Sequence, residues 1–171
     1  PEIENWRNNF KGIRYLDEAT NLDVFGAIDD VWQDINSKEL YIVDYKSTSK
    51  KGDPDIESGW GSGYKRQMEV YQWLFRKNGF PVSDTGYFLY VNGIKGDNGF
   101  YSDHQGYEDI GFMEFKTTLI PYVGKSDWVS GTLKSIKEIL MDDKLPPANE
   151  WWEENRYFYE RLQFERDLGE I

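Results

Sequence analysis

The chain has 171 residues, of which 39% are hydrophobic and 17% aromatic, and its formal net charge at pH 7 is −11. This length and composition indicate one folded domain and exclude a disordered chain. The absence of cysteine excludes disulfides, thiolate zinc sites and cysteine-ligated iron–sulfur clusters. The acidic charge argues against a broad basic surface for nucleic acid, although it leaves room for a small basic cleft.

The apolar runs are only a few residues long, so we expect no membrane-spanning segment. The lack of cysteine fits a cytoplasmic protein. Because the chain begins with Pro1 rather than Met, and no charged-then-apolar leader follows, we expect an excised domain or a trimmed chain with residues missing upstream. We treat residues 1–171 as a single domain in which residues 146–171 form a C-terminal helical tail.

The first half of the chain predicts a short helix followed by β-structure. Residues 4–10 have the spacing of a helix end, with Trp6 and Phe10 on one face. Three runs rich in β-branched and aromatic residues then predict strands at 12–18, 22–35 and 40–47. Because the turns between them are short, we expect these three strands to form an antiparallel meander.

The second half predicts alternating helices and strands after a Gly- and Pro-punctuated loop at 50–63. An apolar stripe at helical spacing predicts a helix over 64–80, closed by Asn78-Gly79. The remaining predicted elements are strands at 85–92 and 111–122, a loop over 93–107 and helices at 125–143 and 149–168. The order predicts an α+β or α/β fold with a mixed central sheet flanked by helices.

Two of the predicted strands carry carboxylates inside apolar runs, which is costly unless something compensates the charge. Side chains alternate along a strand, so Asp44 and Lys46 point to the same face. The preceding strand contains Asp29, which the hairpin can bring beside Asp44. Two neighbouring carboxylates repel each other, and a divalent cation such as Mg²⁺ would compensate them. The pattern therefore predicts a metal site, with Lys46 oriented to stabilise negative charge.

A plainer interpretation is that Asp44 and Lys46 form an ion pair on a solvated sheet edge, because a D-x-K triplet is common. The sequence "LYIVDYKS" is apolar on both faces before the acid, which favours a central strand over an exposed edge. From residue types alone, Asp29 and Asp30 are both candidates for the second carboxylate.

Three short motifs, in order and in suitable elements, resemble the PD-(D/E)xK nuclease superfamily and specifically its RecB-like branch. The sequence "GAIDD", Gly26 to Asp30, matches G-x-x-D; "DYK" matches (D/E)-x-K; and "QMEVY" on the following helix matches Q-x-x-x-Y. The resemblance covers about residues 10 to 80, and it implies a restriction-endonuclease-like core with a mixed central β-sheet.

The resemblance also implies roles for individual residues. Asp29 and Asp44 would be metal ligands for Mg²⁺ or Mn²⁺, joined by the backbone carbonyl of Tyr45, and Lys46 would be the catalytic lysine. The G-x-x-D spacing selects Asp29 over Asp30. On the helix, Gln67 and Tyr71 would border the active site and help to position substrate or the lysine, although Tyr71 also lies on the apolar stripe and is equally explained by core packing.

Basic residues next to this site predict a local surface for DNA on an acidic body. Lys65 and Arg66 at the start of the helix, with Lys50 and Lys51 in the loop, would form a basic mouth; the two loop lysines are equally explained as solubility residues. Many relatives carry a further His or Glu ligand on an upstream helix. Here the only candidates are Glu2, Glu4 and Glu18.

The resemblance implies a metal-dependent deoxyribonuclease that acts on single strands or duplex ends, as an exonuclease in recombination, repair or phage replication. It further implies a protein partner in a recombination or replication complex, and a location in a bacterial or phage-host cytoplasm. The alternative is a catalytically degenerate module of the same fold that binds DNA or a protein partner.

Overall fold

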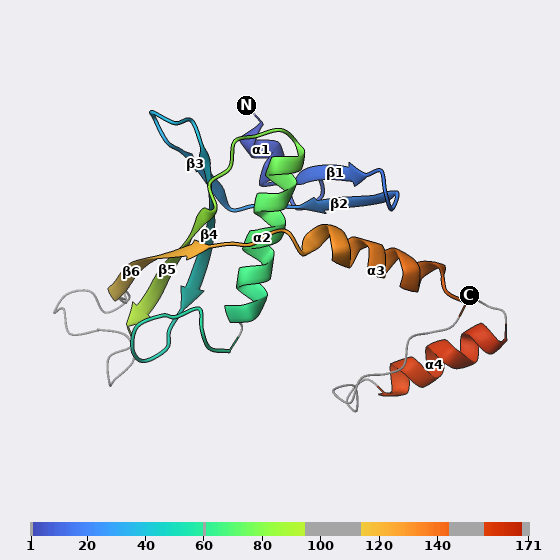
Figure 1. Ribbon diagram of the computed structural model, residues 1–171. Coiled ribbons are helices and arrows are strands. Elements are labelled where there is room, and N and C mark those ends of the chain that lie inside the picture. The colour runs from blue at the N-terminus through green and yellow to red at the C-terminus, as the bar shows by residue number, and fades with distance from the viewer. Residues whose placement is uncertain (1, 60, 95–113, 144–155, 169–171) are drawn as a thin grey trace. The chain divides into compact units, whose positions relative to one another are not determined.

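The computed structural model describes residues 2–59, 61–94, 114–143 and 156–168, and its elements are labelled in Figure 1. The chain groups into two units, Pro1–Val129 and Ser130–Ile171. The first contains a short helix α1 (Ile3–Trp6), helix α2 (Gly61–Lys77), and the strands β1 (Ile13–Asp17), β2 (Leu22–Gly26), β3 (Asp30–Gln33), β4 (Leu40–Thr48), β5 (Thr85–Ile94) and β6 (Glu114–Val123). Helix α3 (Val129–Met141) begins at the boundary, and α4 (Arg156–Asp167) lies in the second unit.

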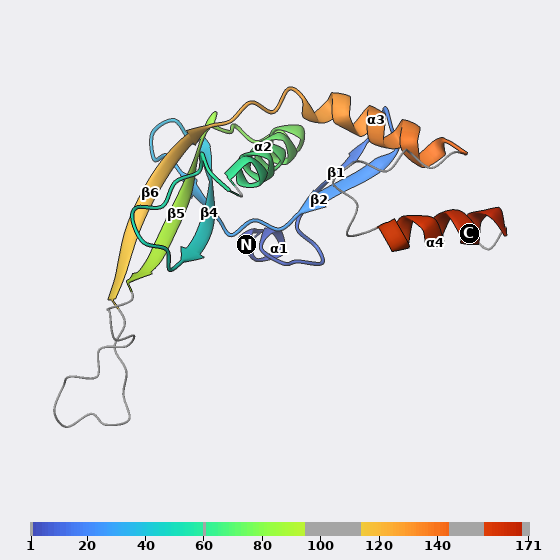
Figure 2. The same cartoon turned by 90° about the horizontal axis from the view of Figure 1, so that it is seen from below.

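The centre of the first unit is a four-stranded sheet in the order β3-β4-β5-β6. β4 and β5 are parallel, whereas β3 and β6 pair antiparallel with their neighbours. The parallel pair requires a crossover, and α2 provides it along one face of the sheet (Figure 2). These features confirm the predicted α+β class with a mixed central sheet flanked by helices. The C-terminal end of β4 therefore lies next to that of β5 in the middle of the sheet.

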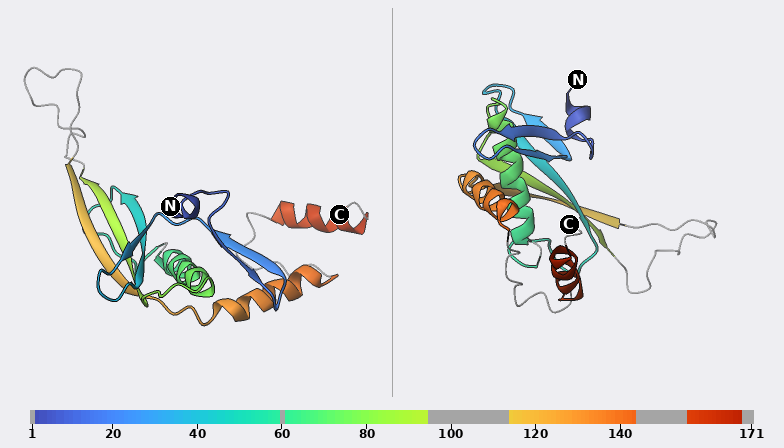
Figure 3. Two further views of the ribbon diagram at one scale, coloured as in Figure 1. Left: turned by 90° about the horizontal axis from the view of Figure 1, so that it is seen from above. Right: turned by 90° about the vertical axis from the view of Figure 1, so that its right-hand side faces the viewer.

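The predicted strand over 22–35 is wrong, because the chain leaves the sheet between β2 and β3. β2 pairs only with β1, in a separate two-stranded sheet that both views in Figure 3 show as a distinct hairpin. The backbone N–H of Ile28 donates instead to the carbonyl of Trp6 at 3.1 Å. Asp29 thus lies in the connection rather than in a strand, and the expected three-stranded meander becomes two antiparallel hairpins.

Helix α2 packs closely on β5 because the strand offers a glycine beneath it. A Cβ on Gly86 would lie 2.4 Å from the sulfur of Met68, which is fully buried. The helix ends where Gly79 adopts φ +82°, and the N–H of Phe80 returns to the carbonyl of Phe75. The predicted closure at Asn78-Gly79 is therefore confirmed, and the rigid contact fixes the height of α2 above the sheet.

A buried carboxylate on α2 joins the helix to the segment that follows β6. Glu69 accepts hydrogen bonds from the hydroxyl of Tyr122 (2.6 Å), the N–H of Lys125 (3.0 Å) and the indole N–H of Trp128 (2.7 Å). Only 7% of Glu69 is exposed, so these donors replace the water that its charge would otherwise need. The network anchors the outer strand to the crossover helix.

The second unit exposes apolar side chains along its helices. Ile139, Leu140 and Met141 of α3 are exposed, as are Phe164 and Leu168 in and just after α4. No helix in the described part of the chain combines the length and apolar character needed to cross a membrane. The prediction of a single domain over 1–171 stays a prediction, as does the part of the tail that lies outside the described residues.

We predict that Tyr122 gives the fold an alkaline limit. Burial, together with the hydrogen bond to Glu69, raises the pKa of Tyr122 to about 12. An unfolded tyrosine titrates near pH 10, so the stabilisation by the protonated hydroxyl is complete below about pH 10 and is lost as the pH rises towards 12. In urea denaturation, the wild type should lose more free energy of unfolding across this range than Tyr122→Phe. Equal losses in the two proteins would contradict the prediction.

Candidate active site

Asp44 and Lys46 form a largely buried ion pair in the middle of the sheet. Lys46 Nζ lies 2.5 Å from Asp44 Oδ2, and the two side chains are 16% and 5% exposed. β4 is buried on both faces up to Asp44, as a central parallel strand should be, which excludes an exposed sheet edge at this point. The pair therefore lies in a low-dielectric environment in which its charges interact strongly.

The Asp44 carboxylate is only partly compensated by its surroundings. Burial raises the pKa of Asp44 above its ordinary value, the contact with Lys46 opposes this, and the neighbouring Asp29 charge raises the pKa further. Lys46 Nζ supplies one positive charge at Oδ2, whereas Asp29 adds a second negative charge nearby. An ionised carboxylate has lone pairs for more than one partner, so the pairing with Lys46 leaves Asp44 able to bind a cation as well.

Asp29 reaches the same strand from the connection between β2 and β3. Its Oδ2 accepts the backbone N–H of Tyr45 at 2.7 Å, at a point where β3 has no residue paired with β4. Asp30 takes a different partner, the Tyr45 hydroxyl, at 2.5 Å. The two adjacent acids therefore have separate partners: Asp29 lies next to the backbone between Asp44 and Lys46, and the half-buried Asp30 contacts the hydroxyl of the exposed Tyr45 ring.

Helix α2 supplies the other contacts of Lys46. The Gln67 side-chain oxygen accepts a long hydrogen bond from Lys46 Nζ at 3.4 Å, and the Gln67 amide nitrogen donates to the Tyr71 hydroxyl at 2.9 Å. The Tyr71 hydroxyl in turn donates to the carbonyl of Ala27 at 2.7 Å. One chain of hydrogen bonds thus runs from the lysine through Gln67 and Tyr71 to the connection that carries Asp29.

Tyr71 combines a place in the core with a polar contact, and its predicted role at the active site stays a prediction. It is 8% exposed and belongs to the buried core, yet its hydroxyl forms the polar link to Ala27. Gly26 makes this approach feasible, because a Cβ at that position would lie 2.6 Å from Cε1 of Tyr71. The glycine of the "GAIDD" motif therefore has a steric explanation.

Two tyrosines next to Lys46 were not identified from the sequence. Lys46 Nζ lies 4.4 Å from the centroid of the Tyr64 ring, in a cation–π contact. Tyr90 is the residue on β5 directly beside Lys46, and it is 5% exposed. Both line a cavity of about 210 Å³ together with Lys46 and Lys50. Because Tyr64 lies three residues before Gln67 on the helix, the spacing indicated that both side chains share one face and that Tyr64 could lie near Lys46.

The two basic residues predicted at the start of the helix lie apart from this cluster in their contacts. Lys65 forms an ion pair with Glu57 at 2.7 Å and lies 5.7 Å from the Tyr122 ring centroid. Arg66 is exposed. Within the described residues, neither contacts Asp29, Asp44 or Lys46, so their predicted role in substrate binding stays a prediction.

The carboxylates fit a hard divalent cation. Mg²⁺ takes oxygen ligands, usually one or two protein carboxylates completed by water and substrate oxygens. Asp29 and Asp44 are two neighbouring carboxylates of this kind, and their predicted role as metal ligands, together with the backbone carbonyl of Tyr45, stays a prediction. The described residues contain no cluster of three or more His, Cys, Asp or Glu side chains that could hold a metal. Glu2, Glu4 and Glu18 are exposed.

Comparison with known families gives one match. The family model described as the PD-(D/E)XK nuclease superfamily matches residues 3–150. This range includes Asp29, Asp44, Lys46 and helix α2, as well as the whole four-stranded sheet. Searches of curated proteins and of solved structures gave no match.

We predict that Gly26→Ala destabilises the protein by about 1–3 kcal/mol, because the new methyl group overlaps the Tyr71 ring and forces it from Ala27. Gly63→Ala is the matched control: it adds a methyl group in α2 that meets no atom within 4 Å, so it should be neutral or stabilise by up to about 1 kcal/mol. Urea denaturation measures both. The steric explanation fails if the two variants change stability alike.

Proposed function

Because the chain belongs to the PD-(D/E)XK nuclease superfamily, we propose that it is a metal-dependent deoxyribonuclease whose active site consists of Asp29, Asp44 and Lys46. Superfamily membership indicates a nuclease-type function and nucleic acid as the substrate class. The observation that carries the specific proposal is the buried Asp44 carboxylate, which has the opposite charge of Lys46 and the like charge of Asp29 beside it. The reaction would be hydrolysis of a phosphodiester bond.

The proposed ligands of Mg²⁺ or Mn²⁺ are the Asp29 and Asp44 carboxylates and the Tyr45 carbonyl. When bound, the cation would lower the pKa of a coordinated water and neutralise charge on the phosphodiester. Because two carboxylates repel each other, the protein needs a fixed backbone to hold them together, and the Tyr45 N–H holds Asp29 in that position. The chain contains no cysteine for an iron–sulfur cluster.

Lys46 would place positive charge beside the reacting phosphate. Its ammonium has three N–H donors, and the described contacts use Asp44, Gln67 and the Tyr64 ring to fix its position. A preorganised cation in a site with little water stabilises negative charge that develops on the phosphate, and it can orient the attacking water. Gln67 and Tyr71 act through Lys46 and the backbone, and are therefore positioning residues.

We further propose exonuclease action on single strands or duplex ends, in recombination, repair or phage replication in the cytoplasm of a bacterium or phage host. Only the resemblance of the three motifs to the RecB-like branch supports this mode of action. A protein partner in such a complex is part of the same proposal.

A degenerate module that binds DNA or a protein partner without cleaving it is the second candidate. It is favoured by the small number of acidic ligands, since only two carboxylates meet at the site within the described residues. The two candidates differ in metal binding and in cleavage, and each can be measured separately.

We predict that the wild-type protein binds Mn²⁺ and that Asp44→Ala abolishes this binding, as measured by titration calorimetry. Asp44→Asn keeps the shape of the side chain but removes its charge, and it should weaken binding at least about tenfold even if the alanine variant fails to fold. Asp30→Asn is the matched control and should bind like the wild type, since Asp30 contacts the Tyr45 hydroxyl instead. Unchanged Mn²⁺ affinity in Asp44→Asn would remove Asp44 from the metal site.

We predict that the protein degrades end-labelled linear DNA in Mg²⁺ or Mn²⁺, that covalently closed circles resist it, and that Lys46→Ala lowers the rate constant by about 10²–10³-fold. Lys46→Ala should still bind Mn²⁺, and Lys125→Ala should cleave like the wild type. Equal cleavage by Lys46→Ala and wild type would remove the catalytic assignment. Cleavage of closed circles would contradict the exonuclease mode, and DNA binding without any cleavage would favour the degenerate module.

A further inference from the structure

A second polar surface continues the sheet face that carries the candidate active site. Tyr90 pairs with Lys46 in the sheet, and Asn92 is the next residue of β5 on the same face. Asn92 lies directly opposite Lys116 of β6. Side chains on one face recur every second residue, so this row lies about 7 Å further along the sheet than the row of Lys46.

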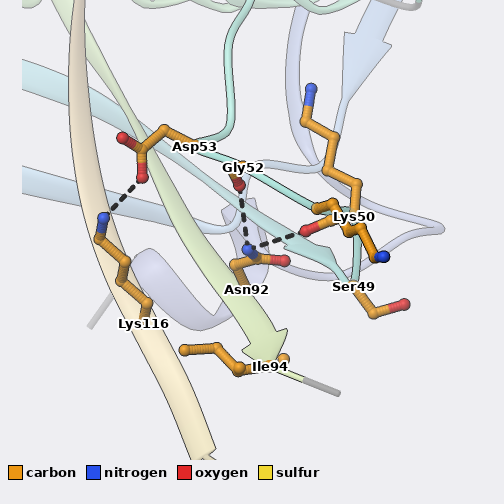
Figure 4. Close-up of a pocket in the computed structure, with 9 residues that line it drawn as sticks. Ser49, Lys50, Gly52, Asp53, Asn92, Ile94 and Lys116 are labelled. Carbon is orange, nitrogen blue, oxygen red and sulfur yellow. Dashed lines mark hydrogen bonds and ion pairs between the residues drawn. The ribbon is translucent and has the colours of Figure 1, made fainter. Parts of the chain in front are cut away.

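This second row lines a cavity of about 450 Å³ at the ends of β4 and β5, shown in Figure 4. Asn92 is only 5% exposed, and its amide nitrogen donates to the carbonyls of Lys50 (3.2 Å) and Gly52 (3.4 Å). The same side chain therefore holds the loop that forms one wall. Its buried Oδ1 makes no hydrogen bond within the described residues. Gly52 adopts φ +86°, a conformation that allows the loop to turn back over Asn92.

The charges around this cavity are mainly positive, in contrast to the acidic chain. Lys50, Lys51 and Lys116 line it, with Asp53 as the acid among its lining residues. Asp53 lies 2.5 Å from Lys116, and Figure 4 shows this pair across from Asn92. Lys50 pairs with Asp55 at 2.9 Å, outside the set of lining residues. Lys51 is exposed, and the structure gives it no acidic partner among the described residues.

The Lys116–Asp53 pair is easily exchanged. Its side chains are 54% and 74% exposed, and ion pairs of this kind contribute only about 0–1 kcal/mol. A phosphate offers the same negatively charged oxygens as a carboxylate, and lysine binds it as a point charge. A strand whose scissile phosphate lies at Lys46 would bring its neighbouring phosphates along the same sheet face.

We propose that this cavity is a binding site for a backbone phosphate of the nucleic acid that flanks the scissile bond, and that Asp53 occupies the place of the phosphate on Lys116 in the free protein. The inference rests on the proposed nuclease function and extends it to substrate positioning. Lys116 and Lys51 contact the phosphate, Asn92 keeps the loop wall in place, and Asp53 sets the affinity by competing for Lys116.

The test measures binding of a fluorescently labelled single-stranded oligonucleotide in Ca²⁺, over a range of salt concentrations. Lys116→Ala should weaken binding several-fold and lower the slope of log affinity against log salt by about 0.7, the value for one lost phosphate contact on a single strand. Asp53→Asn should tighten binding several-fold. Lys125→Ala and Asp84→Asn are matched controls, because they remove the same charges at the opposite end of β5 and β6, and Asp84 is 76% exposed.

A double variant separates a specific exchange from a general charge effect. If Asp53 competes for Lys116, Asp53→Asn should give no gain in affinity in the Lys116→Ala background. The same gain in both backgrounds, or a Lys116→Ala effect no larger than that of Lys125→Ala, would overturn the proposal. Both substituted side chains are exposed, so the variants should fold like the wild type.

Cleavage of the same oligonucleotide in Mg²⁺ tells the two proposals apart. Lys116→Ala should raise KM several-fold and change kcat by less than about twofold, because the contact is made equally before and during the reaction. If the wild type cleaves the oligonucleotide but binding does not depend on Lys116 or Asp53, the phosphate-site proposal is overturned and the nuclease proposal stands. If binding depends on Lys116 and Asp53 but the wild type does not cleave, the nuclease proposal is overturned and the phosphate site is supported.

Discussion

The position of the candidate catalytic groups depends on a close contact between α2 and the connection that joins β2 to β3. The Tyr71 hydroxyl donates to the Ala27 carbonyl, and the absence of a side chain on Gly26 lets the ring approach. This contact holds the chain away from the sheet just before Asp29. The Asp29 carboxylate can then bind the backbone N–H of Tyr45, which has no partner in β3 because the pairing of β3 with β4 ends at Asp30 and Val43. A helix, a loop and a strand are thereby fixed to one another at the point where the carboxylates meet.

The electrostatics of the site follow from burial rather than from net charge. The chain has a formal charge of −11, yet Lys46 is held beside Asp44 at the centre of the first unit. Three other lysines of the first unit, Lys50, Lys65 and Lys116, are each paired with an acid of the loop between β4 and α2: Asp55, Glu57 and Asp53 respectively. Since exposed pairs are weak, a polyanion can replace these acids at little cost. In the free protein these lysines are neutralised by acids. Their positive charges become available to nucleic acid when its phosphates replace those acids.

The sequence predicted the fold and the candidate residues where local patterns were sufficient. The mixed sheet, the helix over the "QMEVY" motif with its stop at Asn78-Gly79, and the superfamily itself are confirmed. Such features depend on side-chain alternation, helical spacing and a glycine stop, all of which are properties of neighbouring residues. The assignment of Asp29, Asp44 and Lys46 to a catalytic role stays a prediction, although the structure brings these three residues together.

Residue types and their order determined which groups could act, but tertiary structure decided how they meet. The run over 22–35 has one continuous strand pattern, and it is divided at Ala27 and Ile28, where the chain makes hydrogen bonds with the Tyr71 hydroxyl and the backbone carbonyl of Trp6. The neighbour of Lys46 on β5, and the cavity lined by Asn92 and Lys116, likewise arise from strands far apart in the chain. A local sequence pattern does not say which distant strand will pair with a given strand. The pairing depends on how the whole sheet is buried against α2.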